Sequence, residues 1–305
     1  MAQHISRALA ALAFTILIWG AAPAFIRSFS LALGPSDALV IRSVTAAALS
    51  LAVLPFFGGF RFKVQDLPRL AVISFIGMFG YFIGTIFGFT YVTAGVGGII
   101  ISTQPLLIAL AAALLGAERL RLATLLGIAL SFGGTLYLFG GGPMNGNHLI
   151  EGGLMIFGAG AAWALYVILS KPLIRRYGAF KITGTSLILG ALPAFYFVTP
   201  QTFHAALNIN REALFALFYL SVIGTLLTVS LWNYAAGHLR PTTVGSSLYL
   251  IPLLTILSGW LILGEPVAAT TLVAGAIVLA GVALAQFGPL IKIRQTTHQE
   301  KSFGG

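Results

Sequence analysis

Long apolar stretches follow one another along almost the whole chain, separated by short polar connections. Each is close to the roughly 20 mostly apolar residues that a helix needs to cross a bilayer. A surface helix of a soluble protein has polar residues that recur with the helical period along one face, and most of these stretches have no such face. The pattern predicts an all-α membrane protein with ten transmembrane helices, at 7–30, 35–58, 68–92, 94–116, 121–141, 150–171, 179–199, 211–236, 241–263 and 268–290.

Two of these stretches contain a proline near the middle of the predicted helix. Gln104-Pro105 lies in the fourth helix and Pro252 in the ninth, and a glutamate follows each proline after 13 residues, at Glu118 and Glu265. Proline removes a backbone hydrogen bond and breaks or kinks a helix. We therefore expect the same interrupted helix to occur twice in the chain.

Other residues repeat in the same order. Trp19 matches Trp163, and Ile-Gly-Thr around Gly84 matches Ile-Gly-Thr around Gly224. Each half then holds five helices, and because five is odd, the second half must enter the membrane from the opposite side. This predicts two inverted repeats around a central cavity, the arrangement of many transporters that work by alternating access. The predicted domains are 1–143, the first repeat, and 144–305, the second repeat with a short polar tail that we expect to be loose.

Composition and charge support a membrane location. Only 8% of the 305 residues are charged and the mean hydropathy is +0.98, against roughly 25% charged residues in a soluble domain. With the N-terminus inside, 14 of the 17 Lys and Arg residues fall on the inner side, only Arg27 and Arg211 fall outside, and Arg42 lies within the second helix. Loops rich in Lys and Arg stay in the cytoplasm, so both termini are predicted to be cytoplasmic. The net charge of +10 therefore needs no nucleic-acid partner.

Polar and aromatic residues at mid-depth are the candidates for a substrate site. Tryptophan and tyrosine usually lie at the membrane interface, so a central group indicates a cavity for ligands with polar and apolar parts. The alternative, left open for each residue, is packing between helices with polar atoms bonded to nearby carbonyls. The candidate substrate-binding residues are Trp19, Tyr81, Thr85, Gln104, Trp163, Tyr166, Thr225 and Tyr249, and the candidate hinge residues are Pro105, Pro252, Gly84 and Gly224.

Ionisable groups exclude several functions. All seven acids and all five histidines fall near helix ends or in loops, so no intramembrane proton relay is visible and facilitated transport is favoured. A hydrolase would need a nucleophile and a base at similar depth, which the pattern does not offer. We expect no enzyme activity, metal or cofactor. Arg42 either pairs with a carbonyl or with Asp37, or attracts an anionic group such as a carboxylate.

Ile18-Trp19-Gly20, Ile41-Arg42 and the Pro…Gly-x-Glu and Pro…Gly-Glu-Pro endings of the fourth and ninth helices resemble the drug/metabolite transporter superfamily, in its ten-helix EamA-type branch. The likeness covers both halves and is greatest to the YddG-type exporters of aromatic amino acids. It implies a bacterial inner-membrane exporter of amino acids or related metabolites. It also implies a cavity lined by the first, third, fourth, sixth, eighth and ninth helices, with the fifth and tenth peripheral.

Several alternatives remain at this point. The superfamily also moves drugs, sugars, nucleotide sugars and purines. A channel or a non-transporting membrane scaffold is the alternative from another class of protein. The expected partners are a small-molecule substrate and the lipid bilayer, and the sequence leaves the oligomeric state open.

Overall fold

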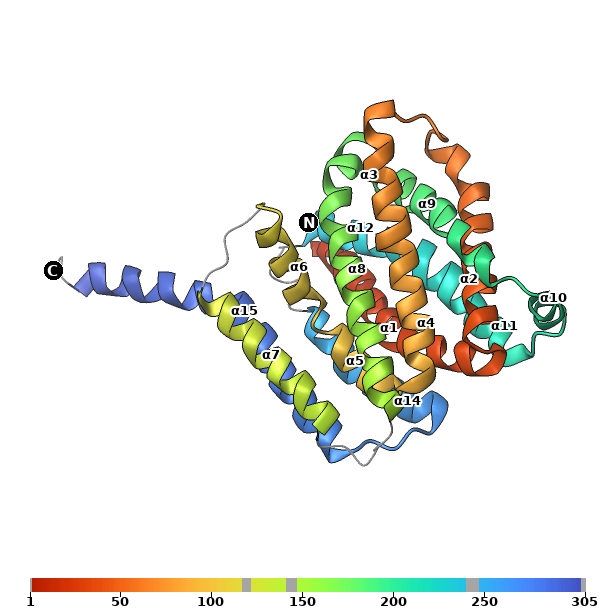
Figure 1. The fold of residues 1–305 in the computed structure, drawn as a ribbon. Helices are drawn as coiled ribbons and strands as arrows, with labels where there is room; N and C mark the ends of the chain where they lie inside the picture. Colours follow the sequence, from red (N-terminus) through yellow and green to blue (C-terminus); the bar gives the residue numbers. More distant parts are fainter. Residues whose placement is uncertain (1, 117–121, 141–146, 240–246, 303–305) are drawn as a thin grey trace.

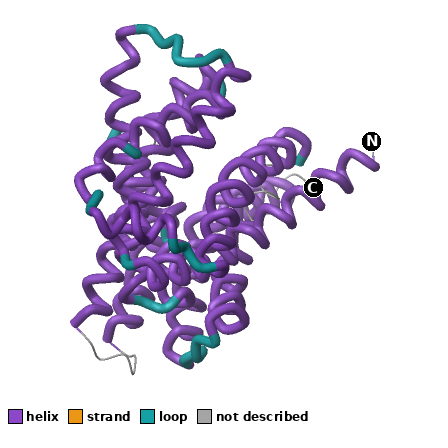
Figure 2. The backbone as a smooth tube through the Cα atoms, turned by 90° about the vertical axis from the view of Figure 1, so that its right-hand side faces the viewer, coloured by secondary structure: helices purple, strands orange, loops and turns teal. Residues whose placement is uncertain are grey.

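The computed structural model describes residues 2–116, 122–140, 147–239 and 247–302, and every regular element in these ranges is helical (Figures 1 and 2). The first half holds α1 (Ala2–Leu33), α2 (Pro35–Val53), η1 (Leu54–Phe57), η2 (Val64–Asp66), α3 (Leu67–Val72), η3 (Ile73–Phe79), α4 (Gly80–Tyr91), α5 (Ala94–Ile101), α6 (Gln104–Leu114) and α7 (Leu122–Gly140). The second half holds α8 (Asn147–Tyr177), α9 (Ala179–Gly190), η4 (Leu192–Phe197), α10 (Pro200–Leu207), α11 (Arg211–Phe218), η5 (Tyr219–Leu227), α12 (Thr228–His238), η6 (Leu248–Leu250), α14 (Ile251–Leu263) and α15 (Ala269–Ser302).

The ten predicted apolar segments all contain helix. Among the described residues six helices are long and apolar enough to span a bilayer, and the bent pair of α10 with α11 and η5 would make a seventh. The fifth, ninth and tenth segments appear as shorter apolar helices. Many large apolar side chains, such as Phe14, Leu126 and Leu261, are exposed, as lipid-facing residues are. The prediction of an all-α membrane protein is confirmed.

Two further segments of the chain are helical. The connection between the seventh and eighth segments forms α10, because Thr199 and Thr202 make a capping box and Pro200 occupies the first turn, where proline fits best. The axis then bends by 95° before α11. The polar tail continues α15 to Ser302, since no glycine or proline follows Leu290 before that residue, and its looseness stays a prediction.

The break at Pro105 is described on both sides, whereas the structure describes the ninth segment only from residue 247 onward. The fourth segment divides into α5 and α6 at a turn formed by Ser102 and Thr103, and Pro105 lies in the first turn of α6. In the ninth segment the 3₁₀ turn η6 precedes α14, whose first turn contains Pro252. In both places proline begins a helix, where its missing N–H costs nothing.

The packing of the helices follows a two-fold pattern. The third helix of the first half, α4, packs along α8, and its counterpart in the second half, formed by α11, η5 and α12, packs along α1. The pairs α2 with α9, α5 with α14, and α7 with α15 each join equivalent helices (Figure 1). The contact of α4 with α8 is very close, since a Cβ on Gly84 would lie 2.6 Å from the carbonyl oxygen of Met155.

The third helix of each half contains a π-helical segment. These segments are η3 in the first half and η5 in the second. In η5 the hydroxyl of Thr225 donates to the carbonyl of Leu220, five residues earlier. A π turn holds one residue more than the α-turn it replaces, and such turns occur frequently at functional sites.

Candidate functional site

A cavity of about 350 Å³ lies between the two halves, next to both proline breaks. Its wall comes from α1, α5 and α6 of the first half and from α8, α12, η6, α14 and α15 of the second. The wall is mostly apolar, and Ser102 and Gln104 are its polar side chains among the described residues. Three tryptophans, Trp19, Trp163 and Trp232, supply the aromatic surface. The volume and lining are those of a small-molecule site.

Aromatic pairs connect the two halves around this cavity. Trp19 of the first half contacts Trp232 of the second, with ring centroids 5.0 Å apart. Trp163 of the second half contacts Tyr81 of the first at 5.2 Å. Each tryptophan of the repeat therefore packs on an aromatic ring from the other half, so a relative movement of the halves changes the shape of the cavity.

The break between α5 and α6 places polar groups on the cavity wall. The hydroxyls of Ser102 and Thr103 donate to the carbonyls of Ile99 and Ile100, at 2.6 and 2.7 Å. Pro105 has no N–H to offer the carbonyl of Ile101, and Ile101 lies on the wall. The turn is thus stabilised by the hydroxyls of its own residues. The carbonyl of Ile101 and the side-chain amide of Gln104 adjoin the cavity.

Tyr81 lies close to both Gln104 and Arg42. The hydroxyl of Tyr81 faces the Gln104 side chain, and Tyr81 also lies within electrostatic range of Arg42. The guanidinium of Arg42 lies 4.4 Å from the ring centroid of Phe82. The expected alternative partner Asp37 instead accepts a hydrogen bond from Thr202 at 2.5 Å.

Thr85 and Tyr166, two of the predicted site residues, do not line this cavity. Thr85 donates to the carbonyls of Tyr81 and Phe82 in its own helix. Tyr166 stacks on Trp163 at 5.1 Å, and its hydroxyl meets that of Thr183 at 3.2 Å. The side chain of Tyr249 lies outside the described residues.

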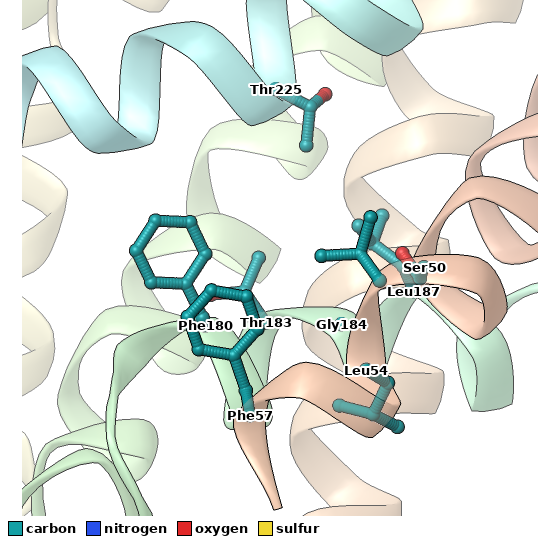
Figure 3. A pocket seen from close by; sticks show the side chains of 9 residues that line it. Ser50, Leu54, Phe57, Phe180, Thr183, Gly184, Leu187 and Thr225 are labelled. Carbon is teal, nitrogen blue, oxygen red and sulfur yellow. The ribbon is translucent and has the colours of Figure 1, made fainter. Parts of the chain in front are cut away.

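Thr225 borders a different and much smaller hollow, of about 30 Å³, between η1, α2, α9 and η5. Figure 3 shows its side chain above the rings of Phe57 and Phe180, which stack at 4.7 Å. This hollow is too small for an amino acid, so it is a packing defect between helices. Gly224, one residue earlier, lies inside the π-helical η5.

A second polar network ties four helix ends together at the end of the bundle that the charge pattern assigns to the outside. Arg27 at the end of α1 pairs with Glu265 after α14, with Nε and Oε1 2.5 Å apart. Its Nη1 also donates to the carbonyls of Phe89 and Val92 at the end of α4. Glu265 Oε2 accepts from the backbone N–H of Ala94 at the start of α5. We call these contacts the outer latch; the repeat counterpart of Glu265, Glu118, lies outside the described residues.

The opposite end of the bundle has its own network. Asp66 accepts hydrogen bonds from Arg176 and from the hydroxyl of Tyr177, both at 2.6 Å. Lys181 donates to the carbonyls of Gly58 and Arg61. Among the described residues no group of three or more His, Asp or Glu side chains is placed to hold a metal ion.

Comparison with protein families also divides the chain into two similar halves. The model of the EamA-like transporter family matches this chain twice, at residues 6–140 and 150–287. The chain belongs to the EamA-like transporter family. This EamA-like protein is therefore a membrane transporter of the drug/metabolite transporter superfamily and not an enzyme.

Relatives of this EamA-like chain cover most of its length. A probable terminal-alkyne amino-acid exporter of Streptantibioticus cattleyicolor is 27% identical over 291 residues, 92% of this chain and 94% of its own. An uncharacterized transporter of Archaeoglobus fulgidus is 25% identical, covering 89% and 95% of the two chains. A probable amino-acid metabolite efflux pump of Salmonella typhimurium is 26% identical, covering 67% and 70%. A crystal structure with a TM-score of 0.57 and 22% identity, covering 92% and 97%, shares the fold.

The geometry of the EamA-like site differs from the expected lining in two ways. The tenth helix, α15, contributes Leu279 and Val282 to the wall although it packs mostly on α7. The third helix does not reach the wall, because Trp163 stands in front of Tyr81. Trp232 was missed by sequence reasoning, since it lies near the end of its predicted span, where a tryptophan is normally an interfacial residue.

Proposed function

We propose that this transporter exports neutral amino acids, aromatic ones among them, from the bacterial cytoplasm by alternating access and without proton coupling. The observation that carries the proposal is the cavity between the repeats, with three tryptophans and one buried amide on its wall. A volume of about 350 Å³ lies at the low end of small-molecule sites, which suits a metabolite better than a drug-sized ligand.

The chemistry of the wall supports an amino acid over a phosphorylated substrate. No charged side chain lies on the described part of the wall, whereas a nucleotide sugar or sugar phosphate needs several cations. Two amino-acid-related exporters among the relatives agree with this choice of substrate class. The resemblance to YddG-type exporters favours aromatic amino acids within it.

The absence of a carboxylate on the described wall supports uncoupled transport. The described acids that form hydrogen bonds or ion pairs are all near helix ends. Asp37 accepts a hydrogen bond from Thr202, and ion pairs join Asp66 to Arg176, Glu151 to His148 and Glu265 to Arg27. A proton-coupled carrier generally needs an ionisable group inside the membrane near its substrate.

Counterflow into proteoliposomes tests the proposal. Vesicles preloaded with unlabelled phenylalanine should accumulate labelled phenylalanine transiently and saturably, and the same assay with sugars and cationic drugs should give no accumulation. Flux that rises linearly with concentration would indicate a channel. No accumulation of any amino acid above empty liposomes would refute the substrate class, and a strict requirement for a pH gradient would refute uncoupled transport.

A further inference from the structure

The carbonyl of Ile101 is a hydrogen-bond acceptor that the fold leaves open beside the cavity. Ile101 is the last residue of α5, and Pro105, four residues later, has no N–H to offer it. Ser102 and Thr103 keep right-handed helical backbone angles, so the Ile101 carbonyl still points along the helix towards Pro105. Ile101 and Pro105 both line the cavity, and none of the hydrogen bonds found among the described residues ends on this carbonyl. It is therefore open to a donor from a ligand.

A second acceptor lies next to it in the chain. The hydroxyl of Ser102, also on the wall, donates its proton to the carbonyl of Ile99 at 2.6 Å, so its oxygen keeps lone pairs for another donor. Thr103 makes the same kind of bond to Ile100 at 2.7 Å but borders a separate hollow of about 110 Å³ between α6, α7 and α8. Of the two hydroxyls at the break, only that of Ser102 therefore belongs to the cavity.

The second half of the chain adds a third acceptor. Leu248 and Pro252 stand in the same relation to each other as Ile101 and Pro105, and both line the cavity. The carbonyl of Leu248 accepts one hydrogen bond, from the N–H of Ile251, and a carbonyl oxygen has room for two. Residues with an available acceptor therefore line the cavity in both repeats.

The ligand group that complements these acceptors is a protonated amine. Three acceptors match the three N–H donors of a primary ammonium group. The C-terminal end of α5 carries a negative partial charge, which favours a cation over a neutral hydroxyl. The faces of Trp19, Trp163 and Trp232 on the wall attract cations as well. The described part of the wall holds no Lys or Arg that would repel a cation or balance a carboxylate.

We infer that the Ile101 carbonyl and the Ser102 hydroxyl, with the Leu248 carbonyl of the other repeat, bind the protonated amine of the substrate. The amine, rather than the carboxylate, is then the group that the carrier requires. The inference rests on the proposed function and specifies which part of an amino acid the protein recognises. Because the acceptors are uncharged oxygens that do not titrate, they bind the cation without a proton relay, in keeping with transport that needs no pH gradient.

A series of competitors tests the inference in the wild-type protein. In phenylalanine counterflow, 3-phenylpropionate and 3-phenyllactate replace the amine with a hydrogen and a hydroxyl. They should compete about tenfold to a hundredfold more weakly than phenylalanine, the range that hydrogen bonds to a charged group provide. The amine 2-phenylethylamine lacks the carboxylate and should compete more strongly than either acid. Equal or stronger competition by either acid would overturn the inference.

Substitution of Ser102 provides the second measurement. S102A should weaken competition by 2-phenylethylamine about tenfold and leave that by 3-phenylpropionate within about threefold, because only the amine uses the hydroxyl oxygen. T103V is the matched control, since it removes the equivalent hydroxyl from the same break but away from the cavity, and it should change neither value. An equal loss for both ligands in S102A, or a loss for the amine as large in T103V, would assign the effect to the helix break and overturn the inference.

Pro105→Ala tests the Ile101 carbonyl itself. Alanine supplies an N–H four residues after Ile101 that can close the helical hydrogen bond, so P105A should weaken competition by 2-phenylethylamine about tenfold and spare that by 3-phenylpropionate. P172A is the matched control, because Pro172 also lies inside a helix but is exposed and not on the wall, and it should change neither value. Unchanged competition by the amine in P105A would overturn the role of the Ile101 carbonyl.

Thermal unfolding in detergent distinguishes failure of this inference from failure of the proposed function. If wild-type vesicles move no amino acid, the proposed function fails, and ligand-induced shifts in Tm then test the amine site. In the wild type and in T103V, 2-phenylethylamine should raise the Tm more than 3-phenylpropionate does, and its effect should be smaller in S102A. A larger shift from the acid, or no shift from the amine, would refute the site.

Discussion

The outer latch gives the strongest quantitative prediction, that Glu265→Gln opens the predicted outer end of the cavity. The substitution removes the charge that faces Arg27 and keeps an oxygen for the N–H of Ala94. The two side chains are 17% and 12% exposed, so the pair is largely buried. Breaking a fully buried pair costs about 3–5 kcal/mol, and because Arg27 retains the carbonyls of Phe89 and Val92, we expect about 2 kcal/mol here.

This loss should appear in the conformational equilibrium. The latch joins the ends of α1, α4 and α5 to Glu265, two residues after α14, so it exists only while these ends are together. A loss of about 2 kcal/mol from the closed state raises the open population about 30-fold.

Cysteine labelling measures this change directly, because the chain contains no cysteine. A single cysteine replaces Val167 on the cavity wall, and an impermeant maleimide is added to each side of sealed vesicles in turn. Glu265→Gln should raise the labelling rate from one side by about 30-fold. Glu151→Gln is the control, because Glu151 is an exposed acid paired with His148, and this substitution should leave the labelling rate unchanged. Equal rates in the Glu265→Gln and control proteins would refute the role of the latch.

Three further predictions concern packing, binding and coupling. Gly84→Val should lower the free energy of unfolding by about 2 kcal/mol, because its Cβ would lie 2.6 Å from the Met155 carbonyl, whereas Gly158→Ala, with open space around its Cβ, should be neutral or stabilising in thermal unfolding. Trp232→Ala should weaken phenylalanine binding about tenfold in competition assays by removing a wall of the cavity, and Trp260→Ala, which is 54% exposed, should not. Collapse of a pH gradient with an ionophore should leave the rate of counterflow unchanged, and a large fall would exclude uncoupled transport.

Hydrophobic length and the prolines predicted much of the fold. The ten apolar segments are helical, and the break expected beside Pro105 separates α5 from α6. These features could be predicted because they depend on local properties, namely the burial of apolar side chains in lipid and the missing N–H of proline. Of the predicted site residues, Trp19, Gln104 and Trp163 reach the cavity together with both prolines.

The remaining site residues could not be placed by depth alone. Successive helical residues turn by about 100°, so two residues at the same depth can face opposite sides of a helix. Thr85 and Tyr166 lie at suitable depths but direct their hydroxyls to their own helix and to α9. Trp232 reaches the cavity from beyond the π-helical η5, which changes the direction of side chains after it and is not visible in the hydrophobic pattern.

The π-helical segments also bear on how the two halves could move without losing their lipid-facing surface. Each stores one surplus residue in the third helix of its half, η3 before Gly80 and η5 before Thr228. If the π-turn moved along the helix by one turn, the side chains between its old and new positions would rotate by about 100° and shift by about 1.5 Å along the axis. The ends of the helix would stay in place. Movement of the π-turn would therefore change which side chains of one helix face the cavity while the neighbouring helices remain packed.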